Sequence, residues 1–157
     1  MLAVVAAFAV WAHLRGPSVV QPVQFNHKYH VEEMELECVD CHTRVTTQAQ
    51  SGRPGIDTCA DCHDTTEDVS PEAAKVAGYV ERGEEIPWQR LYGLPDHVFY
   101  SHRRHVVAAE LDCKECHGPM GTLEAPPPRA PTQITMEFCI GCHTKKGAST
   151  SCNACHK

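Results

Sequence analysis

The chain has 157 residues, enough for one modest domain or two very small ones. Its formal net charge is −6, which excludes the broadly basic surface that binds nucleic acid. Ten cysteines are an unusual number for this length. A chain this short buries only a thin core by itself, so its fold should depend on more than its own apolar side chains.

The chain begins with an uninterrupted apolar stretch at residues 1–12. This stretch is shorter than the roughly 20 residues that span a bilayer, and no basic segment precedes it, as a signal peptide would require. We interpret residues 1–15 as the outer part of an N-terminal membrane anchor helix, with Trp11 near the interface.

Every cysteine belongs to a C-x-x-C pair, and each pair is followed at once by a histidine. C-x-x-C-H is the attachment signature of c-type haem, in which two thiols bind the porphyrin and the histidine is the proximal iron ligand. A zinc ribbon also uses C-x-x-C pairs but requires no histidine directly after them. We therefore expect five haem c groups. Their cysteines are Cys38, Cys41, Cys59, Cys62, Cys113, Cys116, Cys139, Cys142, Cys152 and Cys155, and their proximal ligands are His42, His63, His117, His143 and His156.

A helix is expected between the second and third motifs. Ser70 is a suitable N-cap, Pro71 suits the first helical position, and Gly83 is a suitable stop.

Two segments of the sequence are near copies of each other. FNHKYHVEEMELECVDCH and YSHRRHVVAAELDCKECH share the order aromatic–x–His–basic–x–His–Val and then a C-x-x-C-H motif. The chain is therefore interpreted as a tandem repeat. A two-haem repeat covers 25–63, a linker with a helix covers 64–96, and a three-haem repeat covers 97–157.

Each copied segment holds two histidines that are candidates for the distal, sixth position of an iron. Residues three apart share one helix face, but one iron accepts only one distal ring, so the two members of each pair should serve different haems. The candidates are His27 and His30, then His102 and His105. His97 completes five distal ligands, and Met136 is its alternative because a thioether can also ligate haem iron.

These features predict a mostly irregular chain with short α-helices, in which the haems form most of the hydrophobic core. Residues 1–15 would be the anchor and 16–157 one pentahaem domain. Because haem is attached to c-type apoproteins outside the cytoplasmic membrane, we expect the haem domain on the periplasmic, outer side of that membrane.

Residues 25–156 resemble the class III multihaem cytochromes c, and most closely the pentahaem cytochrome subunit of alternative complex III. The resemblance rests on FNHKYH, the five C-x-x-C-H motifs, IPWQRLYGLPDHVFYSHRRH and TMEFCIGCH. It implies a class III-like fold and an electron-transfer subunit, itself not an enzyme, that carries electrons from quinol oxidation in a membrane oxidoreductase. The implied partners are membrane subunits, an iron–sulfur subunit, and a monohaem cytochrome c or terminal oxidase as acceptor.

Two other functions fit part of the pattern. A multihaem reductase of nitrite-type substrates would need a haem with an open distal position, whereas enough histidines exist here to close every iron. A stand-alone periplasmic or extracellular electron-wire cytochrome would need histidines for ligation between subunits, and none is spare outside the anchor.

Overall fold

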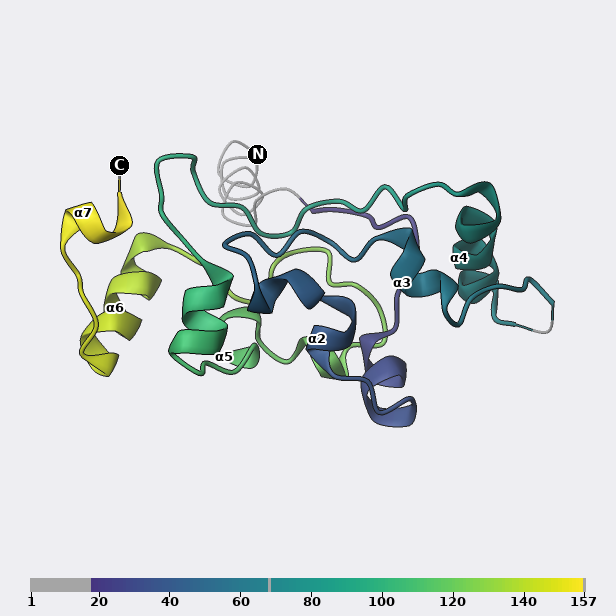
Figure 1. The fold of residues 1–157 in the computed structure, drawn as a ribbon, viewed down its shortest axis with the longest axis horizontal. Helices are drawn as coiled ribbons and strands as arrows, with labels where there is room; N and C mark the ends of the chain where they lie inside the picture. Colours follow the sequence, from purple (N-terminus) through teal and green to yellow (C-terminus); the bar gives the residue numbers. More distant parts are fainter. Residues whose placement is uncertain (1–17, 68, 157) are drawn as a thin grey trace, which may run out of the picture.

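The computed structural model describes residues 18–67 and 69–156 as an elongated row of short helices joined by irregular segments (Figure 1). Within this part of the chain there is no strand, and the single antiparallel bridge joins Val98 to His156. The elements, with η for 3₁₀ and π turns, are η1 (Tyr29–Glu33), α2 (Cys38–Cys41), η2 (Thr43–Thr46), α3 (Ile56–Ala60), α4 (Pro71–Arg82), η3 (Arg104–Ala108), α5 (Lys114–His117), η4 (Met120–Thr122), α6 (Met136–Lys146) and α7 (Cys152–Cys155). The expectation of short helices in a mostly irregular chain is confirmed.

The membrane anchor expected at the N-terminus concerns residues outside the described part of the chain. Among the helices that are described, none is both long enough and apolar enough to cross a bilayer.

The longest helix, α4, begins and ends where the sequence predicts. The Ser70 hydroxyl accepts a hydrogen bond from the Ala73 amide at 3.2 Å, and Pro71 occupies the first turn. Gly83 ends the helix at φ 63°, a left-handed conformation that glycine adopts without a Cβ penalty. The cap residues, which depend only on local chemistry, are therefore readable from the sequence.

The protein's own hydrophobic core is small and lies at one end of the row. Val23, Ile56, Val76 and Ile86 form a buried cluster, and Cys59 packs against it. The cluster joins α3 to α4, on the right in Figure 1. The helices of the other end contribute no residue to it, so that end depends on what its cysteines and histidines bind.

The duplicated sequence segments adopt the same backbone. η1 and η3 are both π turns of five residues, and each is followed by a glutamate with positive φ, Glu35 at 55° and Glu110 at 50°. In both copies the leucine amide after that glutamate donates to the carbonyl of the second histidine, with Leu36 to His30 at 3.0 Å. The two copies therefore share a backbone conformation as well as a sequence pattern.

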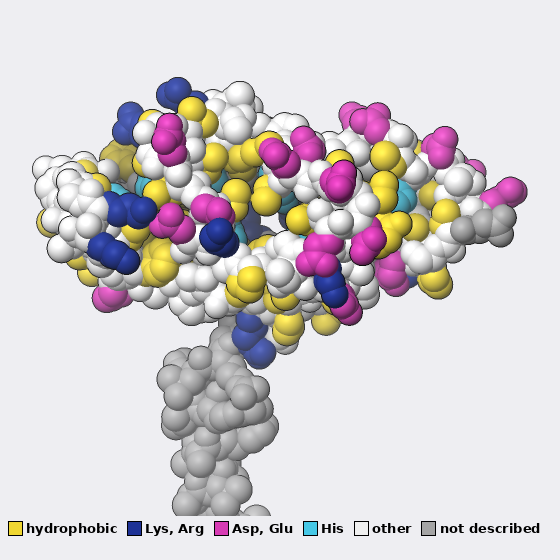
Figure 2. Space-filling model, turned by 90° about the horizontal axis from the view of Figure 1, so that it is seen from below, with side chains coloured by type: hydrophobic (Ala, Val, Ile, Leu, Met, Phe, Trp, Pro, Cys, Tyr) yellow, Lys and Arg dark blue, Asp and Glu magenta, His cyan; other side chains and the backbone are white. Residues whose placement is uncertain are grey.

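Charge is distributed unevenly along the row. On the face seen in Figure 2, acidic side chains gather over the half that holds α3 and α4, whereas lysines and arginines are more frequent over the half that holds α6. The two ends of the molecule therefore present different surfaces to partners.

Candidate haem-binding site

All five C-x-x-C-H motifs fold as a single helical turn. The histidine amide donates to the carbonyl of the first cysteine at 2.9 Å in the first three motifs and 2.8 Å in the fifth, and the fourth lies inside α6. Residues three and four apart on a helix lie on one face. Both thiols and the histidine of each motif therefore point to the same side, as attachment of one porphyrin above its proximal ligand requires.

The cysteine thiols are free, and burial affects their chemistry. No disulfide joins any of the ten. Burial, and then the neighbouring Cys41, raises the pKa of the Cys59 thiol. A raised pKa keeps this thiol in its protonated form at neutral pH.

The structure brings each proximal histidine close to one candidate distal histidine. In four pairs the ring centres are separated by 5.5 to 6.4 Å. The fifth pair is His27 and His42, which lie within electrostatic reach of each other. The other four are His30 with His63 at 6.2 Å, His102 with His117 at 6.4 Å, His105 with His143 at 6.1 Å and His97 with His156 at 5.5 Å.

This spacing fits an iron held between two imidazoles. Metal–imidazole nitrogen bonds are about 2 Å long, and a ring centre lies about 1 Å beyond its nitrogen, so two ligating rings have centres about 6 Å apart. Across the described residues, no group of three or more histidine, cysteine or acidic side chains is placed to hold a metal ion. The histidines are arranged in pairs, and two is the number of protein ligands that haem iron accepts beyond its porphyrin.

Backbone carbonyls fix the tautomer of four of these rings. A carbonyl oxygen only accepts, so the Nδ1 atom facing it must carry the proton, which leaves Nε2 with the lone pair that binds a metal. The four bonds are His30 to Asn26 at 2.8 Å, His102 to Ala49 at 3.1 Å, His105 to Ser101 at 2.8 Å and His143 to Ser149 at 2.6 Å.

His27 differs from these four. Burial, and then the nearby His42 and His30, lower its pKa to about 4, so the ring is neutral at physiological pH and can act as a ligand. Its Nδ1 is buried and has no hydrogen-bond partner. A buried polar atom without a partner is costly. Unlike the four rings above, His27 therefore has no hydrogen bond at Nδ1 that fixes its tautomer.

Aromatic side chains position the distal rings, a role that was not assigned from the sequence. Phe25 stacks on His30 with ring centres 4.4 Å apart, and Tyr100 stacks on His105 at 4.6 Å. Both aromatics stand at the first position of the copied segments. That shared position was visible in the alignment of the two copies and is the signal that could have identified them.

Met136, the alternative to His97, lies at the first residue of α6 and is 57% exposed. His97 instead stacks on His156, with an interplanar angle of 26°. The geometry thus favours His97 as the ring that faces the fifth motif.

Comparisons with known proteins identify the family of the chain. Residues 6–84 match the class III cytochrome c family, and residues 98–157 match the family of cytochrome c7 and related cytochromes c. A relative from Nitratidesulfovibrio vulgaris strain Hildenborough is described as the multihaem cytochrome c subunit of menaquinone reductase. It is 29% identical over 99% of this chain and 87% of its own length. From the motifs, the paired histidines and these matches, the chain belongs to the class III cytochrome c family.

Proposed function

We propose that this chain binds five haem c groups and serves as the electron-transfer subunit of a membrane quinone oxidoreductase. The observation that carries the proposal is the pairing of each motif histidine with a second histidine from elsewhere in the chain. A haem bound by the two histidines of each pair would supply one-electron redox chemistry, and its iron would have no open position for a substrate.

The paired histidines also separate this function from its alternatives. A nitrite-type reductase needs an open iron, and the described residues provide a second ring for every motif. A self-assembling wire needs histidines that are free to ligate a neighbouring copy. Each described histidine lies near another one inside the chain, so we favour neither alternative.

The complex is proposed from the relative and from the sequence resemblance. The relative's description as a menaquinone reductase subunit favours electron flow towards quinone. The resemblance to alternative complex III favours flow from quinol to a monohaem cytochrome c or an oxidase, through an iron–sulfur subunit. In both candidates the chain conducts electrons on the periplasmic side of the membrane while another subunit performs the quinone chemistry.

Purification from membranes with a tag on this chain tests the proposal. We expect membrane subunits to copurify, identified by mass. A menaquinol analogue, added without oxygen, should reduce the haems of the complex but not those of the isolated chain, and reoxidation by added menaquinone gives the favoured direction. Recovery of the chain alone, with haems that bind nitrite, would contradict the proposal.

A further inference from the structure

The first and second motifs are neighbours because they share one turn of histidines. Around η1, His27 lies beside His42 of the first motif, while His30 faces His63 of the second. The two distal candidates are three residues apart in the chain, so the groups that they serve must lie close together. The attachment cysteines agree, since Cys41 and Cys62 are within electrostatic reach of each other.

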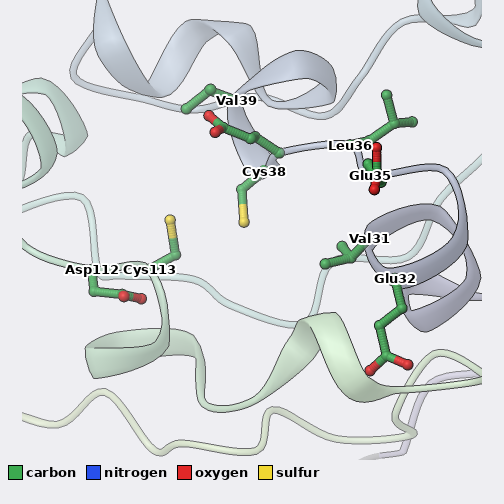
Figure 3. Close-up of a pocket in the computed structure, with 9 residues that line it drawn as sticks. Val31, Glu32, Glu35, Leu36, Cys38, Val39, Asp112 and Cys113 are labelled. Atoms are coloured by element: carbon green, nitrogen blue, oxygen red, sulfur yellow. The ribbon is translucent and has the colours of Figure 1, made fainter.

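The first motif also lies against the third, although the second motif separates them in sequence. Cys38 and Cys113 line a common cavity of about 690 Å³, and their sulfur atoms point towards each other across it (Figure 3). The apolar side chains of Val31, Leu36 and Val39 form part of its wall, and Figure 3 shows them beside Cys38.

A backbone contact joins the same two motifs. The His102 amide donates to the Ala49 carbonyl at 2.9 Å, and His102 Nδ1 donates to the same oxygen at 3.1 Å. Ala49 belongs to the segment that follows the first motif, whereas His102 faces His117 of the third. The distal candidate of the third motif is therefore held by the chain that leaves the first.

The third motif is joined to the fourth by the second histidine turn. His102 faces His117 and His105 faces His143, from positions three residues apart at η3. An ion pair between Lys146 and Glu115, at 3.3 Å, links α6 to α5.

The fourth and fifth motifs are joined through their cysteines and the loop between them. Cys139 lies within electrostatic reach of Cys155. In the connecting loop, the Ser149 carbonyl accepts the Nδ1 hydrogen of His143 at 2.6 Å.

From these contacts we propose that the five haems stand in one row in the order second, first, third, fourth, fifth motif, with the second and fifth at the ends. The proposal rests on the proposed function, because it requires that all five haems are bound. Figure 1 shows the motif helices in this order along the long axis: α3, α2, α5, α6 and α7. After α4 the chain runs back along the row, which is how the third motif comes to lie beside the first.

The two ends of the row differ in how far the protein covers them. The second-motif end is packed against the small core of α3 and α4, whereas residues 144–154 at the fifth-motif end are exposed throughout. The fifth-motif end is therefore the more exposed end of the row, and the first-motif haem, between the second and the third, is an internal relay.

A pair of redox titrations tests the order. His30→Ala opens the second-motif haem, which then has the optical spectrum of an open iron, distinct from the other four, and serves as the reporter in titrations without CO. In this background His27→Met raises the potential of the first-motif haem and His102→Met that of the third. A neighbour that is already reduced carries one positive charge less and lowers the midpoint of the reporter, and this effect weakens with distance.

We expect the reporter's midpoint to fall with His27→Met and to stay within error with His102→Met. If the haems followed sequence order, the second-motif haem would lie between the first and the third. Its midpoint would then respond to both substitutions. A response to His102→Met as large as that to His27→Met, or a response to neither, overturns the proposed order. A mass showing fewer than five haems would instead overturn the proposed function, so the two failures are distinguishable.

The native protein gives an independent check if these variants fold poorly. Anomalous scattering from crystals of the haem-loaded protein locates the irons directly. The iron held by His42 should lie between those held by His63 and His117. The distance from the His117 iron to the His42 iron should be shorter than its distance to the His63 iron. The reverse result would contradict the row.

Discussion

His97 lies against His156, with ring centres 5.5 Å apart. The contact is reinforced by the bridge between Val98 and His156 and by the Phe99 amide, which donates to the Cys155 carbonyl at 2.7 Å. The fifth motif thus meets the segment just before the second histidine turn, and His97 is the ring that stacks on its histidine.

The first prediction follows from this contact. His97→Ala should open one haem and allow the reduced protein to bind one equivalent of CO, whereas Met136→Ala should leave every iron closed. CO titration followed by the optical spectrum measures both. CO binding by the Met136→Ala protein, with none by the His97→Ala protein, would assign the ligand to the methionine.

The second prediction concerns the first histidine turn. His27→Ala and His30→Ala should each open one haem, but a different one, because His27 lies by His42 and His30 by His63. The double variant should bind two equivalents of CO. Lys28→Ala is the matched control, because Lys28 pairs with Glu124 at 2.9 Å and faces no motif. The Lys28→Ala protein should bind no CO. Equal CO binding by the double and single variants would show that both rings serve one iron.

The third prediction concerns the aromatic rings that stack on distal histidines. Tyr100→Ala should loosen His105 and raise CO binding at one haem, while Tyr100→Phe should behave as the native protein. Phe25, without a hydroxyl, fills the equivalent position in the first copy. Burial raises the pKa of Tyr100 to about 12, so its hydroxyl stays protonated and the ring brings no charge beside His105. Loss of ligation in the Tyr100→Phe protein would require a role for the hydroxyl.

Much of the site is readable from the sequence, because its chemistry is local. Five C-x-x-C-H motifs, two copied histidine pairs and the capped helix after Ser70 each depend on spacing of a few residues. The order of the motifs in space is not readable, since it depends on contacts such as Cys38 with Cys113. The returning segment after α4 places the third motif beside the first, although the second motif separates them in sequence.

The conformation of Glu35 could not be predicted either. A non-glycine residue at φ 55° carries strain of about 1 kcal/mol or more, and nothing in its residue type indicates it. Its counterpart Glu110 at 50° shows that the turn from the histidine segment into the motif requires this geometry in both copies.

The fourth prediction follows from that strain. Glu35→Gly should be tolerated and keep the midpoint of thermal unfolding at or above the native value. Glu35→Val, which is β-branched, should lower the free energy of unfolding by about 1 kcal/mol or more. Thermal denaturation followed by the haem absorbance compares them, and Glu33→Val serves as a control nearby, in η1. Equal stability of the Gly and Val proteins would mean that the turn rearranges.

Intact mass spectrometry of the native protein counts the covalent haems on this chain directly, and we propose that there are five. The protein should be produced in cells that mature c-type cytochromes and denatured in acid before measurement, to release loosely bound groups. The five-haem proposal predicts the mass of the polypeptide plus five haems, with all ten cysteines bonded. A mass with fewer haems, or cysteines that remain reactive to alkylation, would contradict it.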